Sequence, residues 1–155
     1  MIRKAGIKDA KKIQKLINSF AKKELMLPRS LNQVYGAIRD FFVFENDNGK
    51  VVGCAALSPS WDDLAEIRSV AIAKKFQKAG VGTQLVNACL KEAKSFGFKK
   101  VFLLTYVPKY FAKFGFKKAD RKRFPHRIWT ECINCPKFPD CEEIALIKRI
   151  KNIAK

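Results

Sequence analysis

Two spacings of hydrophobic residues alternate along this chain, and each spacing predicts one kind of element. Runs rich in β-branched and aromatic residues predict strands at residues 1–5, 41–45, 50–57, 64–72, 100–105 and 143–150. Apolar residues at helical spacing predict helices that begin after Asp9, Ser30 and Gly80 and at Pro108. A strand and two helices, then antiparallel strands, then a strand–helix–strand crossover predict an α/β (α+β) fold, with a mixed, mostly antiparallel sheet and helices on both faces.

Turn and cap residues mark several of these boundaries. Asp47–Asn48–Gly49 lies between two strand patterns and is a strong hairpin signal. Ser30 and Gln33 fit a capping box for a helix that runs to about Arg39. Asp9 is placed to cap the first helix.

The loop before the third helix has the residues of an anion site. Gln77, Gly80 and Gly82 follow a strand pattern and open an amphipathic helix. The two glycines let a ligand approach the backbone closely. The helix N-terminus turns N–H groups and positive dipole toward an anion such as a pyrophosphate. Further positive charge beside the loop comes from Lys74, Lys75 and Lys78.

This loop resembles motif A of the GNAT superfamily of acyl-coenzyme A-dependent N-acyltransferases, whose pattern Q/R-x-x-G-x-G/A it matches. A second element of that family, an aromatic helix ending in Gly-Phe, is found at residues 110–116. The resemblance covers roughly residues 1–150 and implies a GNAT fold, in which the motif A strand bulges and splays away from its neighbour. We therefore expect one N-acetyltransferase domain over residues 1–155, with a Cys-containing insertion at about 124–141.

The resemblance implies acetyl-coenzyme A as the acyl donor. In the family, the pantetheine arm pairs with the opened strand edge much as an added strand does. A backbone N–H near Val70 would polarise the thioester carbonyl and stabilise the oxyanion. The residues expected to bind the cofactor are Val70, Ala71, Ile72, Gln77, Lys78, Ala79, Gly80, Val81, Gly82, Thr83 and Phe111.

Glu66 is the expected general base. Acetyl transfer requires a neutral amine, and a carboxylate can accept the amine proton directly or through water. Glu66 precedes Val70 by four residues, so it can flank the cleft without occupying the thioester position. The alternative is an edge carboxylate paired with Arg68 or with a lysine.

The proton donor for the departing thiolate is less direct to assign. Many GNAT enzymes carry a Tyr four residues before the Gly of the aromatic helix, and here that position is Phe111. Tyr110 is next to it but is expected to point elsewhere. Thr105, at the end of the preceding strand, is the first choice as donor or organiser and Tyr106 the second. Thr105 also fits an ordinary strand position.

Several segments resemble the acetyltransferase domain of N-acetylglutamate synthases, namely residues 27–31, 54–57, 66–72 and 103–105. This resemblance implies a small-molecule amino-acid acceptor, L-glutamate, and a role in arginine biosynthesis. Planar Arg forks bind carboxylates bidentately, and a solvated surface charge is the alternative for each arginine of so basic a chain. The residues expected to bind the substrate are Arg29, Ser30, Arg68 and Arg127.

Residues 124–141 carry three of the five cysteines and the one histidine of the chain. A Cys3His zinc set is one interpretation, an internal disulfide another, and reduced thiols along a substrate loop a third. The metal is not favoured, because only the CxxC spacing is typical of zinc. The four residues concerned are His126, Cys132, Cys135 and Cys141.

The net charge of +18 leaves other functions open. Lysines are spread through every element, which favours a solvated surface over a nucleic-acid site. No apolar run reaches the ~20 residues that span a bilayer, so we expect a cytoplasmic protein without a membrane partner, and a homodimer remains open. The alternatives to glutamate are a protein N-terminus, lysine or another small amine as acceptor, or a non-catalytic module that binds RNA or protein.

Overall fold

The described part of the chain, in this computed structural model, comprises residues 1–23, 26, 28–120 and 143–150. The strands are β1 (Ile2–Lys4), β2 (Phe41–Glu45), β3 (Val51–Pro59), β4 (Leu64–Ile72), β5 (Lys100–Thr105), β6 (Lys117–Lys118) and β7 (Ile144–Arg149). The α-helices are α1 (Ala10–Ala21), α2 (Leu31–Gly36), α3 (Val81–Phe96) and α4 (Pro108–Ala112), and short 3-10 turns are η1 (Ile7–Asp9), η2 (Ile38–Asp40) and η3 (Lys74–Phe76). Each strand predicted from the pattern is present, with bounds within two residues of those expected.

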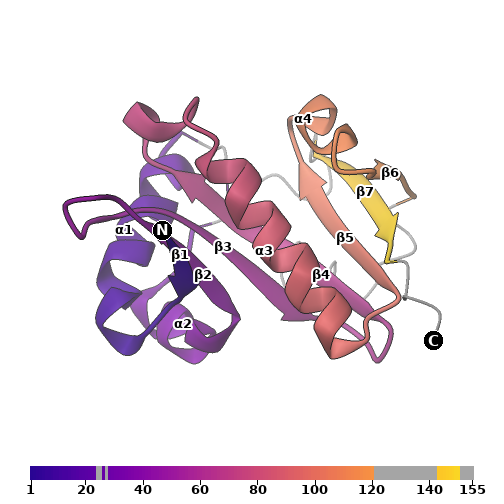
Figure 1. The fold of residues 1–155 in the computed structure, drawn as a ribbon, viewed down its shortest axis with the longest axis horizontal. Coiled ribbons are helices and arrows are strands. Elements are labelled where there is room, and N and C mark those ends of the chain that lie inside the picture. Colours follow the sequence, from indigo (N-terminus) through magenta and orange to yellow (C-terminus); the bar gives the residue numbers. More distant parts are fainter. Residues whose placement is uncertain (24–25, 27, 121–142, 151–155) are drawn as a thin grey trace.

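Within the described residues the strands form one sheet in the order β1-β2-β3-β4-β5-β7-β6. Every neighbouring pair is antiparallel except β4 and β5, which are parallel and joined through α3. Helices α1 and α2 lie on one face of the sheet and α3 crosses the other (Figure 1). The expected mixed, mostly antiparallel sheet with helices on both faces is confirmed.

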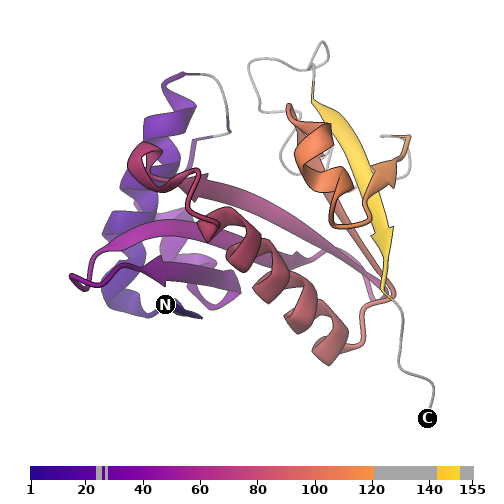
Figure 2. The same ribbon diagram turned by 45° about the horizontal axis from the view of Figure 1, so that its top comes forward.

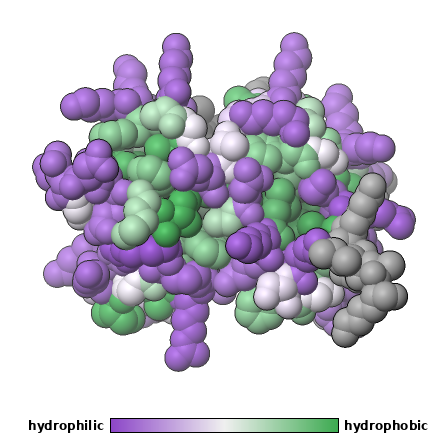
Figure 3. Space-filling model, in the orientation of Figure 1, coloured by the Kyte–Doolittle hydropathy of each residue, from purple (hydrophilic) through white to green (hydrophobic). Residues whose placement is uncertain are grey.

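Each face of the sheet has its own hydrophobic core. On one face α3 buries Leu85, Cys89 and Ala93 against the sheet. On the other face α1 buries Ile13 and Ile17. On the face drawn in Figure 3, hydrophilic side chains project around patches of hydrophobic residues. None of the described helices is both long and apolar enough to cross a bilayer.

A β-bulge in β4 reverses the direction of its side chains. Cys54 of β3 pairs with Ala71, while Ala56 pairs with Arg68, so two residues of β4 stand opposite one residue of β3. One of the two, Ser69, has a φ of +57°, a left-handed value that is uncommon for a residue with a side chain. The extra residue bends the strand and increases its local twist. The bulge expected from the family resemblance is therefore present, at Ser69.

The bulge allows apolar residues at odd-numbered and then at even-numbered positions of β4 to face the same core. Before it, Ala65 and Ile67 face the core under α3; after it, Val70 and Ile72 face the same core, although the parity of their numbers has changed. Without the extra residue, the second pair would point to the opposite face, because side chains alternate strictly along a strand. The apolar residues of β4 thus require the bulge.

Some local expectations differ from the structure. Asp9 does not cap α1 with its side chain. Its carboxylate instead accepts the backbone N–H of Gly6 at 2.7 Å, one turn earlier, and pairs with Arg3 at 2.7 Å. The capping box of Ser30 and Gln33 is confirmed. However, α2 ends at Gly36, α4 ends at Ala112 rather than Phe114, and the short β6 was not expected.

Asp9 generates a stability prediction. It is nearly buried, and its hydrogen bond from the Arg3 guanidinium holds the pKa of the carboxyl below its usual value. Asp9→Asn should lower the free energy of unfolding at neutral pH by about 1.5–3 kcal/mol, the usual contribution of hydrogen bonds to a charged group. A depressed folded-state pKa stabilises above the unfolded pKa of ~4, and this stability is lost as pH falls through the folded-state value.

Urea unfolding from pH 7 down to pH 2 measures this effect, with exposed Asp47→Asn as the matched control. The difference between wild type and Asp9→Asn should shrink in acid. A difference that stays constant across the range would show that shape, rather than charge, accounts for the effect.

Candidate active site

The cleft follows from the point at which β4 and β5 separate. The two strands pair only from Leu64 to Glu66 against Lys100 to Phe102. Beyond Glu66 they diverge, and Figure 2 shows the half of the molecule that carries β5, α4 and β7 turning away from the half that carries β4. A cleft of about 440 Å³ occupies this opening. Because its lining includes Phe20 of α1 and Tyr110 of α4, it extends between both faces of the sheet.

Glu66 and Arg68 project from β4 on the face covered by α1 and α2, opposite to Ile67, which faces the core under α3. Glu66 has only 4% of its surface exposed, yet it lines the cleft. It stands at the last paired position of β4, where the strands begin to diverge. Glu66 is thus a carboxylate shielded from bulk water at the edge of an open space.

On the other wall of the cleft, Thr105 ends β5 and is 6% exposed. The backbone N–H of Val107 donates to its Oγ1 at 2.9 Å. That bond occupies an acceptor position of the hydroxyl and leaves its proton available to another group. Thr105 therefore lines the cleft with one acceptor position of its hydroxyl occupied, and Tyr106 lines the cleft beside it.

The N-terminus of α3 lacks a side-chain cap. Gly80, its N-cap residue, has a φ of +79° and no side chain to accept from the first turn. The amide groups there keep the donors that an anion can use. Lys113 lies across the opening, with Nζ 3.5 Å from Oγ1 of Thr83 and 4.1 Å from the ring centre of Tyr110. Cation and amide donors thus meet at one place.

A side chain of the opposite wall approaches Gly82 closely. A Cβ built on Gly82 would lie 2.7 Å from Oη of Tyr110 and 3.2 Å from Cδ1 of Ile72. The hydroxyl of Tyr110 therefore rests against the backbone of the α3 N-terminus. The expectation that Tyr110 points elsewhere was wrong, because Tyr110 and Phe111 both line the cleft.

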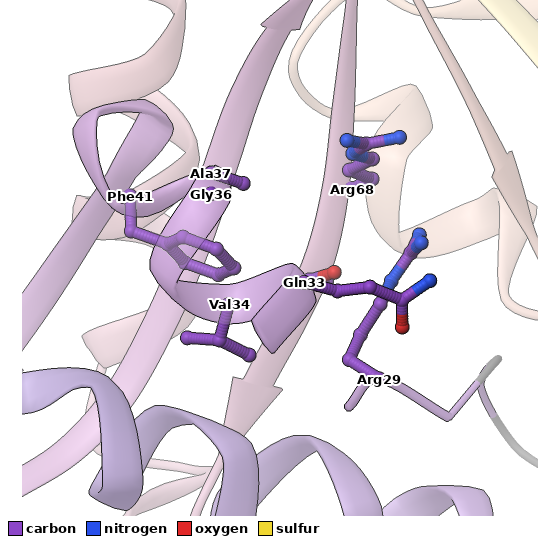
Figure 4. A pocket seen from close by; sticks show the side chains of 8 residues that line it. Arg29, Gln33, Val34, Gly36, Ala37, Phe41 and Arg68 are labelled. Atoms are coloured by element: carbon purple, nitrogen blue, oxygen red, sulfur yellow. The ribbon is translucent and has the colours of Figure 1, made fainter. Parts of the chain in front are cut away.

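A second hollow of about 220 Å³ adjoins the cleft and shares Arg29, Arg68 and Ser69 with it. Figure 4 shows the guanidinium groups of Arg29 and Arg68 on one side of this hollow, with Phe41 on the other. The backbone of Arg29 is held by Asn18 of α1, which accepts from its N–H and donates to its carbonyl, both at 3.1 Å. Two cations therefore line a space next to Glu66.

Asp40 adds a negative charge near this hollow. Burial raises the pKa of its carboxyl, and the positive charge of Arg68 opposes that rise. Arg68 and Asp40 are therefore close enough to interact electrostatically. The guanidinium of Arg68 is also among the groups that line both cavities.

The sequence-predicted residues fall into groups. Lining the cleft are Glu66, Arg68, Val70, Ile72, Gln77, Gly82, Thr105, Tyr106, Phe111 and Arg29. Lys78, Ala79, Gly80 and Thr83 surround the start of α3, while Ala71 and Val81 are buried in the two cores. Ser30 lines neither cavity, because its hydroxyl accepts from the backbone N–H of Gln33. Arg127, His126, Cys132, Cys135 and Cys141 lie outside the described residues.

Sequence reasoning missed Tyr110, Gln33, Phe20 and Met26, which line one cavity or the other. Gln33 carried a signal as a cap residue, but not as a cavity residue. Gln77 was expected to bind the cofactor. In the structure its side chain donates to the carbonyl of Ile72 at 3.1 Å, a bond that links the loop between β4 and α3 to the end of β4.

The two described cysteines are core residues. Cys54 and Cys89 are fully buried, and burial raises the pKa of Cys54 to about 12. Such thiols do not form the thiolate that a nucleophile requires. Among the described residues no group of three or more His, Cys, Asp and Glu side chains is arranged to hold a metal ion.

Comparison with known proteins agrees with this geometry. Residues 10–116 match the acetyltransferase (GNAT) family. The chain is 37% identical over 149 residues to an uncharacterized N-acetyltransferase of Chlorobaculum tepidum, covering 96% of both chains. It is 35% identical over 133 residues to an amino-acid acetyltransferase of Mycobacterium tuberculosis, covering 84% of this chain and 76% of that protein.

Among solved structures, the chain resembles N-acetylglutamate synthase from Neisseria gonorrhoeae complexed with coenzyme A and N-acetyl-glutamate. The TM-score is 0.87 at 26% identity, over 98% of this chain and 35% of that one. The fold, the opened strand pair and the family match agree with one another, and the chain belongs to the GNAT acetyltransferase family.

Proposed function

We propose that this chain transfers the acetyl group of acetyl-coenzyme A to the α-amine of a free amino acid, with L-glutamate as the first choice. The family makes it an acyl-coenzyme A-dependent N-acetyltransferase with acetyl-coenzyme A as donor. The observation that carries the choice of acceptor is the placement of Glu66 beside a space lined by Arg29 and Arg68. With L-glutamate as acceptor, the reaction is that of N-acetylglutamate synthase, in arginine biosynthesis.

The donor side is supported by the N-terminus of α3. Its uncapped amides and the nearby Lys113 suit the pyrophosphate of the cofactor. From there the pantetheine arm would run along the edge of β4 exposed beyond Glu66, where no strand of the described sheet pairs on the β5 side. Backbone amides near the bulge at Val70 would face the thioester carbonyl.

The acceptor side is supported by charge. Glutamate brings two carboxylates, and arginine binds a carboxylate with paired, charge-assisted hydrogen bonds. Arg29 precedes α2 and Arg68 lies on β4, and both guanidinium groups are on the same side of the hollow, where they can bind carboxylate oxygens. This arrangement favours an acidic amino acid over a polyamine, whose charge these cations would repel.

The chemical step is direct attack in a ternary complex. Glu66 accepts the proton of the α-ammonium, directly or through water, and the neutral nitrogen attacks the thioester carbonyl carbon. The C–N bond forms, the C–S bond breaks, and the departing thiolate takes a proton. Thr105 is our first choice for the group that supplies or directs that proton, because its hydroxyl lines the cleft with its acceptor side already occupied.

Acetyl-coenzyme A consumption with glutamate, glutamine, aspartate and lysine tests the proposal. Glutamate should give the highest kcat/KM. Turnover of lysine or of peptide N-termini, with none of glutamate, would assign the chain to a different acceptor class within the same family.

Cofactor binding should depend on Gly82. Gly82→Glu forces the side chain against Tyr110 and places a negative charge at the α3 N-terminus. Repulsion between unit charges about 4 Å apart costs on the order of 1–4 kcal/mol near a surface, so acetyl-coenzyme A should bind roughly 5- to 1000-fold more weakly. Calorimetry measures the affinity, and a melting curve confirms that the variant is folded. An unchanged Kd would move the phosphate site elsewhere.

Glu66→Gln should preserve cofactor affinity and lower kcat by ~10²–10⁴-fold, the range expected for removal of a general base. The loss should become smaller at high pH, where the acceptor amine is already neutral. A kcat–pH profile of both proteins provides the measurement. Wild-type kcat at neutral pH in the variant would remove Glu66 from the mechanism.

Arg29→Ala should raise the KM for glutamate and leave the KM for acetyl-coenzyme A nearly unchanged. Loss of a charge-assisted contact costs ~1.5–3 kcal/mol, or roughly 10- to 150-fold. Arg39→Ala, at an exposed arginine that lines neither cavity, is the matched control. Equal changes in both KM values would indicate that Arg29 shapes the fold rather than the acceptor site.

A further inference from the structure

The hollow beside the cleft is placed to receive one end of the acceptor. Under the proposed function, on which this inference rests, the α-amine lies at Glu66 inside the cleft. Because the α-carboxylate is attached to the same carbon, we place it in the cleft as well. The distal end of the side chain extends further, and the 220 Å³ hollow, which shares Arg29, Arg68 and Ser69 with the cleft, is the adjoining space.

Gln33 lines that hollow, and a helix cap fixes the direction of its amide. The backbone N–H of Ser30 donates to Oε1 of Gln33 at 2.8 Å, and the hydroxyl of Ser30 accepts the backbone N–H of Gln33 at 3.0 Å. An N–H donor can be met only by the amide oxygen, so the capping box determines which end of the amide is oxygen. The Nε2 group must therefore point away from Ser30.

The direction of Nε2 is toward the cations. In Figure 4 the amide nitrogen of Gln33 points toward the Arg29 guanidinium and the amide oxygen points away from it. The hollow is thus lined by hydrogen-bond donors from Arg29, Arg68 and Gln33. Apart from the Ser69 hydroxyl, which can donate or accept, the polar side chains of the hollow are donors. Such a lining suits a carboxylate, which only accepts hydrogen bonds, better than a carboxamide, whose NH2 group would mostly face other donors.

We infer that Gln33 is a specificity-determining residue, whose amide NH2 donates to the side-chain carboxylate of the acceptor and selects it over the corresponding carboxamide. Gln33 does not contact the reacting atoms, which lie near Glu66. The helix cap is what makes the selection effective, because a freely rotating glutamine could turn its oxygen toward a carboxamide and accept both ligands.

Gln33→Glu separates this role from helix capping. A glutamate at this position can still accept the N–H of Ser30, so the capping box survives, while the NH2 donor is replaced by an acceptor oxygen with negative charge. Asn32→Asp, at the preceding exposed position that lines neither cavity, places the same charge on the same turn and is the matched control. Melting curves of both variants test that capping is intact.

The experiment measures kcat and KM for glutamate and for glutamine in the wild type and both variants. In Gln33→Glu, the ratio of kcat/KM for glutamate to that for glutamine should fall roughly 10- to 150-fold, as expected for loss of a charge-assisted hydrogen bond. The KM for acetyl-coenzyme A should not change. Asn32→Asp should keep the wild-type ratio.

Three other outcomes would overturn the inference, and they differ from one another. If the wild type acetylates glutamate and Gln33→Glu keeps the wild-type ratio, the inference fails while the proposed function stands. If Asn32→Asp lowers the ratio equally, net charge rather than the Gln33 amide selects the acceptor. If the wild type acetylates no free amino acid, the proposed function fails and this inference fails with it.

Discussion

One extra residue in β4 determines which face of the sheet each later side chain of that strand meets. Before the bulge the strand directs Glu66 and Arg68 toward α1 and α2, and after it Ala71 takes that direction while Val70 and Ile72 return to the core under α3. Ser69, which has a left-handed backbone conformation, is stabilised by β3, because the buried thiol of Cys54 donates to its carbonyl at 3.4 Å. A residue in this region costs free energy that the surrounding structure must offset.

The bulge lies close to the point at which β4 separates from β5. Pairing between them stops at Glu66, three residues before Ser69. The open edge of β4 and the bulge thus follow one after the other along the same stretch of strand, and the cleft lies beside both. The two sides of the cleft remain in contact at the start of α3, where Tyr110 approaches Gly82 and Lys113 approaches Thr83.

Much of this could be predicted from the sequence, and the exceptions have physical reasons. Strand runs and glycine loops are local signals, so β4, β5 and the α3 start were placed correctly. The bulge itself came from the family resemblance, although the order Ala65, Ile67, Val70, Ile72 already changes parity and could have indicated it. Asp9 was wrongly predicted to cap α1. Its carboxylate accepts hydrogen bonds from Arg3 and Gly6, and these contacts form only once the chain before α1 has folded, so helical spacing does not reveal them.

Cavity residues were harder to predict, since two elements must meet before a cavity exists. Tyr110 was dismissed from its place on a short helix, but the missing Cβ of Gly82 gives its hydroxyl room to approach. Gln33 was correctly assigned to the cap, and only the packing of α2 beside β4 places it at a cavity. Residues 121–142, which include the cysteine-rich segment, lie outside the described part of the chain.

Because the cleft extends between the two faces of the sheet, its position affects how the two substrates bind and dissociate. Under the proposed function, the cofactor enters from the side of α3 and α4 and the amino acid from the side of α1 and α2. The cofactor and the amino acid therefore reach the cleft from opposite faces of the sheet. Neither ligand has to leave before the other can bind or dissociate. A single inhibitor that joins both would have to reach from one face of the sheet to the other, along the cleft where β4 and β5 diverge.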